Sequence, residues 1–581
     1  MAAPAKRQPL AASRVVGAIP AWSEPRLRGG RLFWLERRPA EGGRSALLCR
    51  PLDDLNGPAP TPLEISPSGA DLRSRTHDYG GGVYALAEDG AGGTMVVWVN
   101  DRDRALWSLA LPPLAPSGSG EVDAPGALAQ RASAGSASDP GSAEAPRRLT
   151  SADPARRFAD GLIDAPRQRW IGVLEEGEAE ALVAVPLAGG EPQPLRQAAD
   201  FIGYAALSPS SSHLAWVEWQ RPWMPWERSE LWLGRIGAAG ELLEARRIAG
   251  SGAGDREGIS IFQPLWIPRA EGPADLVVAN DRSGWWNLEC LRGAEALTAA
   301  EEPRWQALLP QPAEFALPQW VYGMRSTAWD GEALVAMACR DGRWELGRLS
   351  LPERLPALAE LPQPPSPQTQ HFSEGQHKGQ SEARGEGQRK RQREIEGEGE
   401  AGLAPAAGPH WCPLDLPFDD LAAVAAEAGR VVALAASATE PSGLLERDSA
   451  TGRWRHTPAS PGPLPIEAIS TPEAIAFAGH GGITSQAWYY PPAGGGGPRS
   501  PLLVRAHSGP TGMARTGVSL AIQFWTSRGW GVVDVNYGGS TGFGRAYRQR
   551  LDGRWGVVDV ADCAAAASCL VESGRADRRR I

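Results

Sequence analysis

The stretch PLLVRAHSGPTG (501–512), followed by QFWTSRGWGVVDVNYGGSTGFGRAYRQRLDGRW (523–555), decides how the carboxyl-terminal part of this chain folds. Residues 502–506 form a short apolar run that ends at a turn, and residues 531–535 form a second one. Residues 514–528 between them are long enough for a helix. Strand, helix and strand in this order predict a parallel pair joined by a crossover, which is the opening of a doubly wound α/β domain.

The segment after the second strand, residues 536–544, is too rich in glycine for a helix or a strand. It follows the carboxyl end of a strand, where open α/β sheets place their ligand sites. It contains no G-K-[ST], so it is not a phosphate-binding loop. A further helix is predicted at about 557–572, and residues 578–581 would lead into a third strand.

Bulk properties limit the classes of protein to consider. A chain of 581 residues is too long for one core and predicts two or more domains. The formal net charge of −9 argues against nucleic acid as a partner. The six cysteines have no C-x-x-C spacing, which indicates reduced thiols of a cytoplasmic protein. Neither a signal peptide nor eighteen consecutive apolar residues are found, so no membrane partner is expected.

The composition of the larger, preceding part favours many short strands. The chain has 23 Trp, 69 Gly and 52 Pro, and from about residue 31 to residue 455 it repeats a strand–turn–strand theme. Seven such units are counted, centred on residues 32–51, 83–111, 169–195, 204–248, 262–291, 321–351 and 422–454. Units of this size cannot close a core alone and must stack on their neighbours. We therefore predict a mainly β fold, a seven-bladed β-propeller at 21–460 followed by the first part of an α/β-hydrolase domain at 465–581.

Two inserts interrupt the predicted propeller. Residues 112–146 are dominated by Ala, Ser, Gly and Pro, and residues 355–409 run from a Pro/Gln-rich to a Glu/Arg/Lys/Gly mixture. Both have too few large apolar residues to offset the entropy of ordering, so they are expected to be disordered surface loops. Residues 1–20 are expected to be a flexible amino terminus.

Several of these segments resemble the prolyl oligopeptidase family of serine peptidases, on its acylaminoacyl-peptidase and dipeptidyl-aminopeptidase branch. In the carboxyl-terminal part the resemblance lies in HSGPTG, in residues 523–548 and in GRWGVVDVADC (553–563). In the preceding part it lies in RTHDYGGG (75–82), NDRSGWWNL (280–288) and AEFALPQWVYGM (313–324), among others. The resemblance implies a propeller that sits over a hydrolase active site and filters substrates by size.

The resemblance also implies how the active site is assembled. In relatives the next strand carries a G-x-S-x-G nucleophile elbow, and the triad Asp and His follow it. We assign no such elbow to this chain and expect the whole triad beyond Ile581. The turn HSGP maps onto the family's H-G-G-P turn, in which the second glycine supplies an oxyanion donor, here Gly509. Ser508 replaces the first glycine and would strain the turn if that position needs a positive φ. His507 is implied to be a structural part of the turn.

Other candidates have weaker support. Tyr537 and Ser540 follow a strand and either line the pocket or pack beneath the nucleophile helix. Asp534, Asp559 and Asp562 precede the expected nucleophile, whereas the order in hydrolases is Ser, Asp, His, so none is expected to be the triad acid. No H-x-x-x-H or H-E-x-x-H spacing supports a metal site, and no cofactor is expected.

Two functions follow as hypotheses. The first is the leading portion of a serine exo- or oligopeptidase, which in its complete form cleaves short peptides through an acyl-enzyme, while this chain alone is inactive. The alternative is a non-catalytic propeller that binds a partner. Cleavage specificity and oligomeric state stay open at this point.

Overall fold

The computed structural model describes residues 9–17, 19–114, 145–252, 254–255, 257–351, 409–462 and 464–581. The two inserts expected to be disordered, 112–146 and 355–409, lie outside the described residues except for 112–114, 145–146 and 409. Residues 1–8 of the amino-terminal segment also lie outside them.

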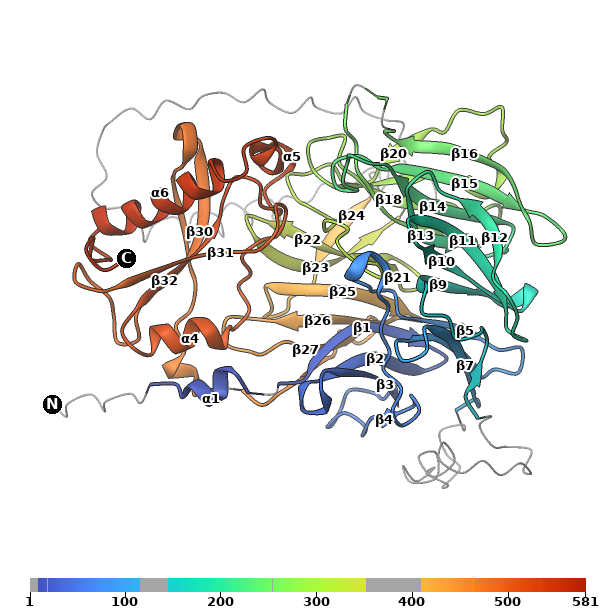
Figure 1. The fold of residues 1–581 in the computed structure, drawn as a ribbon, viewed down its shortest axis with the longest axis horizontal. Coiled ribbons are helices and arrows are strands. Elements are labelled where there is room, and N and C mark those ends of the chain that lie inside the picture. The colour runs from blue at the N-terminus through green and yellow to red at the C-terminus, as the bar shows by residue number, and fades with distance from the viewer. Residues whose placement is uncertain are drawn as a thin grey trace, which may run out of the picture.

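Seven four-stranded antiparallel sheets follow one another along the chain, and an eighth, mixed sheet completes the carboxyl-terminal part (Figure 1). Each of the seven units predicted from the sequence falls within its own sheet. In each of the seven antiparallel sheets the strands pair in the order in which they occur along the chain, which is the meander expected of propeller blades. The mainly β fold class, with a propeller of seven blades before an α/β segment, is confirmed.

The first four blades span residues 21–250. Blade 1 consists of β1 (Ala21–Arg28), β2 (Arg31–Arg38), β3 (Arg44–Pro51) and β4 (Leu63–Glu64). Blade 2 consists of β5 (Tyr84–Glu88), β6 (Thr94–Asn100), β7 (Ala105–Leu111) and β8 (Arg147–Arg148). Blade 3 consists of β9 (Arg156–Asp164), β10 (Arg169–Glu176), β11 (Ala179–Pro186) and β12 (Gln193–Gln197). Blade 4 consists of β13 (Phe201–Leu207), β14 (His213–Trp219), β15 (Glu230–Ile236) and β16 (Leu242–Gly250).

The last three blades span residues 261–458. Blade 5 consists of β17 (Ile261–Ile267), β18 (Asp275–Asn280), β19 (Asn287–Leu291) and β20 (Trp305–Ala307). Blade 6 consists of β21 (Thr327–Trp329), β22 (Leu334–Arg340), β23 (Arg343–Ser350) and β24 (His410–Pro413). Blade 7 consists of β25 (Asp420–Glu427), β26 (Arg430–Ala436), β27 (Gly443–Asp448) and β28 (Trp454–Pro458). The first strand of each blade contacts the first strand of the next, and β25 contacts β1, so the ring is closed.

The first strands of five blades share a distortion. In β1, β9, β13, β17 and β25 the pairing with the neighbouring strand shifts register at a bulge. A residue with a left-handed backbone lies in each of these strands: Glu24, Asp160, Tyr204, Gln263 and Ala423. Bulges of this kind bend a strand and increase its twist, which suits strands that crowd around a central axis.

No strand is shared between blade 1 and blade 7, so side chains alone close the ring. Arg50 on β3 pairs with Glu446 on β27, and both side chains are almost completely buried. Arg455 bridges Glu446 at 2.9 Å and Asp53 at 2.7 Å. An apolar cluster that includes Trp34 on β2 extends across the same boundary.

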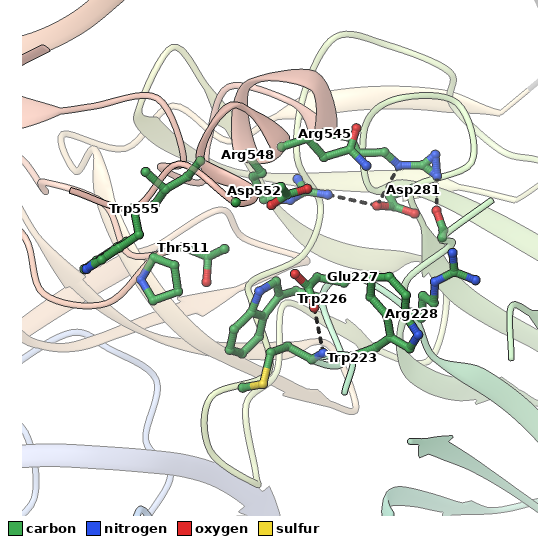
Figure 2. Close-up of a pocket in the computed structure, with 16 residues that line it drawn as sticks. Trp223, Trp226, Glu227, Arg228, Asp281, Thr511, Arg545, Arg548, Asp552 and Trp555 are labelled. Carbon is green, nitrogen blue, oxygen red and sulfur yellow. Dashed lines mark hydrogen bonds and ion pairs between the residues drawn. The ribbon is translucent and has the colours of Figure 1, made fainter. Parts of the chain in front are cut away.

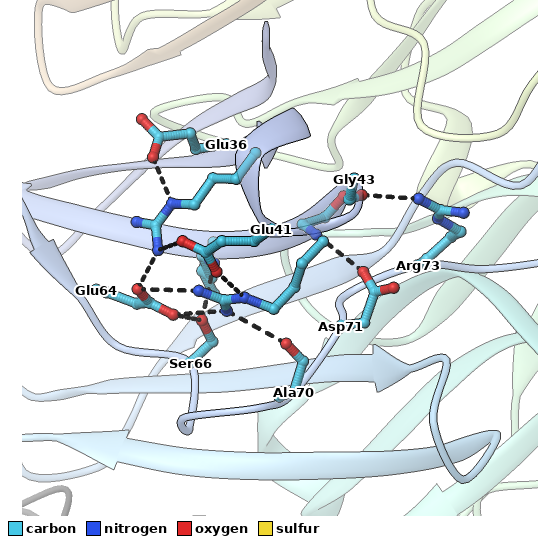
Figure 3. Close-up of polar contacts among 12 residues, drawn as sticks. Glu36, Glu41, Gly43, Glu64, Ser66, Ala70, Asp71 and Arg73 are labelled. Carbon is cyan, nitrogen blue, oxygen red and sulfur yellow. Dashed lines mark hydrogen bonds and ion pairs between the residues drawn. The ribbon is translucent and has the colours of Figure 1, made fainter. Parts of the chain in front are cut away.

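The outermost strand of blade 1, β4, is only two residues long and is held mainly by charges (Figure 3). Arg38 Nη1 donates to the Glu64 carboxylate at 2.6 Å, and Arg44 Nη1 donates to it at 2.8 Å. Arg44 Nη1 also donates to the carbonyl of Ala70 at 3.3 Å. These contacts fix the end of the blade where few ladder hydrogen bonds are available.

The eighth sheet has the order β29 (Glu473–Ala478), β30 (Thr484–Tyr490), β32 (Gly531–Asn536), β31 (Leu502–Ala506). Strands β31 and β32 are parallel, and the other pairs are antiparallel. The predicted parallel pair therefore forms, with α4 (Leu520–Thr526) in the connection between its strands. Residues 578–581 form no strand; the carbonyl of Arg580 accepts a hydrogen bond from the Leu502 N–H.

Helices cover both faces of this sheet. The long helix α6 (Val558–Glu572) packs on the face that includes Val533 and Val535, and α4 packs on the face that includes Val532. Alternating side chains of β32 thus point to opposite faces, as a strand buried on both sides requires. A short helix, α5 (Arg545–Arg548), follows the glycine-rich segment and continues into a 3-10 turn, η7 (Gln549–Leu551).

The amino-terminal helix α1 (Ala12–Val15) lies against α4 rather than against the propeller (Figure 1). The backbone N–H of Leu10 donates to Ser527 Oγ at 3.1 Å, and Arg528 donates to the Leu10 carbonyl at 2.9 Å. Both ends of the described chain therefore lie in the part of the molecule built around the eighth sheet, the amino-terminal end on α4 and the carboxyl-terminal end beside β31. None of the helices in the described ranges has the length and apolarity needed to cross a membrane.

Candidate active-site cleft

The turn after β31 presents a backbone donor. Gly509 has a φ of +76°, a conformation that side chains disfavour. A Cβ at Gly509 would also lie 3.0 Å from Cζ2 of Trp320 on the propeller. Within the described part of the chain the N–H of Gly509 donates no hydrogen bond. A half-buried, unpaired N–H held by a tight turn is the kind of group that stabilises a developing oxyanion.

Ser508, at the position of the family's first glycine, adopts no left-handed backbone conformation. A serine at this position therefore does not strain the turn, because the residue of the turn with a positive φ is Gly509. The side chain of Ser508 is exposed at the surface of the turn.

His507 is locked into a hydrogen-bonded group beneath the turn. Its ring stacks on Tyr537 with centroids 4.3 Å apart, and its Nε2 lies 2.7 Å from Ser540 Oγ. Tyr537 donates its hydroxyl to the carbonyl of Gly509 at 2.7 Å. Burial lowers the pKa of His507 to about 4, so the imidazole is neutral near pH 7.

The hydrogen bonds of Ser540 determine what His507 can do. Ser540 Oγ lies 2.8 Å from the carbonyl of Tyr537, and the Nδ1 of His507 lies 3.3 Å from the carbonyl of Ser508; each carbonyl can only accept. The neutral imidazole carries one N–H proton, so the Ser508 carbonyl and Ser540 Oγ compete for it. His507 has no carboxylate hydrogen-bonded to Nδ1 among the described residues, so it lacks the orienting partner of a catalytic base. The pair therefore stabilises the turn.

Gly538, Ser540 and Gly542 have the spacing of a G-x-S-x-G elbow, although we assigned no nucleophile there from the sequence. An elbow serine sits on a strained turn that exposes its hydroxyl at the start of a helix. Ser540 is completely buried and has no left-handed backbone, and helix α5 begins only at Arg545. The spacing alone thus gives no nucleophile here. Neither Tyr537 nor Ser540 lines the cleft described next.

A cleft of about 420 Å³ lies beside the turn, between the propeller and the eighth sheet (Figure 2). Its propeller wall is the connection between β14 and β15, which carries Trp226 and Glu227. Its other wall holds Thr511, from the segment after the turn, and Asp552 and Trp555, from the segment after α5. This concave surface, which combines three tryptophans with six charged side chains next to an unpaired backbone donor, is the best candidate for a substrate site.

Helix α5 is anchored to the propeller by a buried charge network at the edge of the cleft. Arg548 donates to Glu314 at 2.6 Å and to Asp281 at 2.9 Å, and its guanidinium lies 3.8 Å from the ring centroid of Trp286. Arg545 bonds Asp281 at 3.2 Å. We did not identify these residues from the sequence; the i, i+3 spacing of the two arginines on one helix was the available signal.

The three aspartates excluded as triad acids have other contacts. Asp562 is completely buried and accepts hydrogen bonds from Ser485 Oγ and from the Gly538 N–H, which fixes the glycine-rich segment. Asp559 accepts from the Gly556 N–H, and Asp534 lies 3.6 Å from Arg505.

One group of side chains among the described residues has donor atoms close enough to ligate a metal: His77, Glu175 and Glu180, on the propeller. Each is already engaged. His77 Nε2 bonds Glu180, and Glu175 accepts from Arg157 at 2.6 Å and from the His77 N–H at 2.8 Å. A metal ion would have to displace these bonds.

Comparisons with known proteins agree with this architecture. The model of the prolyl oligopeptidase family matches residues 516–581. An acylamino-acid-releasing enzyme of Arabidopsis thaliana is 36% identical over 81 residues, which are 14% of this chain and 11% of that protein. Dipeptidyl peptidase family member 6 of Caenorhabditis elegans is 34% identical over 80 residues, 14% of this chain and 11% of that protein. The matched segments therefore span about a tenth of these relatives.

The likeness to solved structures extends over the whole chain. A puromycin-hydrolyzing peptidase of Mycobacterium tuberculosis has a TM-score of 0.74 and 28% identity, covering 99% of this chain and 74% of that one. The fold and the turn define a β-propeller protein with an α/β-hydrolase segment. Residues 516–581 match the prolyl oligopeptidase family, and the chain is similar to an acylamino-acid-releasing enzyme, a dipeptidyl peptidase family member and a puromycin-hydrolyzing peptidase.

Proposed function

We propose that this chain forms the propeller and the oxyanion-binding turn of a serine peptidase that cleaves short peptides through an acyl-enzyme. The observation that carries the proposal is the unpaired N–H of Gly509 beside the cleft between propeller and hydrolase segment. In such a reaction a serine hydroxyl attacks the scissile carbonyl, the amine leaves, and water releases the acyl group. The Gly509 N–H would stabilise the negative oxygen formed at the carbonyl.

The propeller supports the choice of short peptides. The cleft opens between the ring and the eighth sheet, and the anchored helix α5 holds these parts together. A long, folded polypeptide would have to part them, whereas a short peptide would not. A cytoplasmic location remains part of the proposal.

We further propose that residues 1–581 by themselves do not hydrolyse peptides, because Ser540 is completely buried and its Oγ contacts the Tyr537 carbonyl at 2.8 Å. The purified chain should release no chromophore from aminoacyl or acyl-aminoacyl p-nitroanilides and should not be labelled by a fluorophosphonate probe. Stoichiometric labelling that is lost in Ser540→Ala would show that Ser540 is the nucleophile after all.

The gene sequence after the codon for Ile581 separates the peptidase from a non-catalytic, partner-binding propeller. An in-frame strand, G-x-S-x-G turn and helix, with Asp and His codons further on, supports the peptidase. A stop codon with no such coding sequence downstream contradicts the peptidase and supports the binding protein.

A further inference from the structure

A second cavity, of about 440 Å³, lies on the axis of the propeller. Its wall includes residues from the first strand of every blade: β1, β5, β9, β13, β17, β21 and β25. The charged side chains that line it are Arg26, Arg28, Asp160 and Arg325. Three of these four side chains are basic, so the cavity wall itself carries an excess of positive charge.

Two segments that connect blades separate this axial cavity from the active-site turn. Gly81, between blades 1 and 2, forms a backbone bridge with Tyr322, between blades 5 and 6. A Cβ at Gly81 would collide with the carbonyl oxygen of Tyr322, so the two backbones are in direct contact. Trp320 lies against Gly509 on one side of this crossing, whereas residues 323–325 line the axial cavity on the other. The cavity is therefore distinct from the active-site cleft.

Arg325 opens a free guanidinium into the axial cavity. Its backbone is held in place, because its carbonyl accepts the N–H of Val424 at 3.1 Å. Its side chain is exposed to the cavity and makes no hydrogen bond or ion pair within the described part of the chain. A guanidinium has five N–H donors, and here all of them are left for a ligand or for water.

Arg26 supplies a second guanidinium that is only weakly engaged. Its Nη2 donates to Glu24 at 3.4 Å, and the guanidinium lies 4.8 Å from the ring centroid of Tyr84. The charge of Arg26, followed by burial, lowers the pKa of Arg325 to about 10. Both arginines are still protonated at pH 7, so two like charges that repel each other are held at the same cavity.

The acids near the cavity do not neutralise Arg325. Glu24 and Asp160 each accept a backbone N–H, and Glu427 is paired with Arg28 at 2.9 Å. Burial raises the pKa of all three carboxyl groups, which opposes their ionisation. No described carboxylate lies within ion-pair distance of Arg325, so an anion from solution would reduce the repulsion between the two arginines.

We propose that Arg26 and Arg325 bind an oxyanion, a carboxylate or a phosphate, in the axial cavity of the propeller. The N–H groups of a guanidinium form a planar fork that matches the oxygen atoms of either anion. The volume of about 440 Å³ leaves room for an organic part of the ligand beside its anionic group. This site is separate from the proposed peptidase site and does not depend on it.

Calorimetric titration of residues 1–581 in a low-salt buffer at pH 7 tests the proposal. The ligands are inorganic phosphate, N-acetyl-L-alanine and N-acetyl-L-alaninamide, which lacks the charge of the second. At least one of the two anions should bind, and the neutral amide should bind at least tenfold more weakly than the tighter anion. Tighter binding of phosphate would identify a phosphate as the ligand group, and tighter binding of N-acetyl-L-alanine a carboxylate.

Variants localise the binding. Arg325→Gln and Arg26→Gln should each weaken binding of the anion about tenfold, because each removes one charged fork. Arg102→Gln removes an exposed arginine outside the cavity and should change the affinity less than twofold. Since the Arg325 guanidinium has no described partner to lose, Arg325→Gln should leave the midpoint of urea unfolding unchanged or raise it.

Three results would overturn the oxyanion site: no binding of either anion, equal affinity for the amide and the tighter anion, or unchanged affinity in Arg325→Gln. A lower unfolding midpoint in Arg325→Gln would also contradict it, because it would show that the guanidinium stabilises the fold instead. None of these results bears on the peptidase proposal.

Discussion

At the scale of single residues, the propeller shapes the turn that would bind the oxyanion. The left-handed backbone of Gly509 points its N–H out of the local hydrogen-bond network, and Trp320 from the propeller packs where a side chain would otherwise begin. Tyr537 holds the turn from below by donating to the Gly509 carbonyl. The donor is therefore fixed before any substrate arrives, which is the condition for efficient electrostatic stabilisation.

The neutral state of His507 leads to a prediction. Its folded-state pKa is about 4, below the ordinary value of 6.5, so the unfolded chain binds more protons between these values. Stability contributed by this group should be complete above about pH 6.5 and should be lost as the pH falls toward 4. In NMR spectra, the ring signal of His507, assigned by its loss in His507→Gln, should not titrate between pH 8 and 5.

The urea-unfolded chain provides the control for His507, because its histidines should titrate near 6.5. A midpoint above 6 for His507 in the folded protein would show that the ring is hydrated or paired with a charge, contrary to the burial seen here.

The sequence allowed some of these residues to be found and not others. Gly509 could be identified because long matching segments flank a turn that follows a strand. The burial of Ser540 could not, because it depends on His507 and Tyr537 closing over it. Glu227 and Asp552 come from opposite walls of the cleft, and no local pattern connects them.

At the scale of elements, the repeated strand–turn–strand pattern in the sequence was sufficient to predict seven blades. Alternating apolar residues predict strands locally, and every predicted unit lies in one sheet. The bulges in the first strands were not predicted, because the left-handed residues there, such as Glu24 and Tyr204, are of types that rarely adopt that conformation. These residues lie where the strand pairing shifts register, and such a bulge depends on the neighbouring strand as well as on the local sequence.

Strand β31 gives a prediction about hydrogen exchange. It is at the edge of its sheet, paired only with β32. The Pro501 carbonyl accepts from Gly531 of β32, and the Leu502 N–H bonds Arg580 on the other side, so the following N–H groups alternate between the two sides. The Val504 and Ala506 amides should therefore exchange at least a hundredfold faster than that of Val533, which lies inside the sheet. Mass spectrometry with fragmentation resolves these amides.

Exchange at β31 also reports on what covers the edge. An unpaired edge is a template for another strand. Strong protection of Val504 and Ala506 at low protein concentration would contradict an open edge, and protection that appears only at high concentration would indicate pairing between copies of the chain.

At the scale of the whole molecule, the two parts are joined by charges buried at their boundary. Arg548 of α5 reaches into the propeller to Glu314 and Asp281, and Arg515 pairs with Asp420 of β25. Burial raises the pKa of Glu314, and the charge of Arg548 opposes that shift. Each ion is costly to bury alone, so these contacts favour the docked arrangement specifically. The cleft between the two parts exists only in that arrangement.

Buried ion pairs also close the ring of blades, so removing one of them should destabilise the protein. Because blades 1 and 7 share no strand, Glu446 joins them by binding Arg50 and Arg455, and its side chain is completely buried. Glu446→Ala would leave the buried guanidinium of Arg50 without its counter-ion, while Arg455 would keep Asp53; breaking such a buried pair costs about 3–5 kcal/mol. The midpoint of urea unfolding, followed by tryptophan fluorescence, should fall accordingly, whereas exposed Glu440→Ala should change stability by less than about 0.5 kcal/mol. If both variants unfolded like the original chain, apolar packing around Trp34 would be what closes the ring.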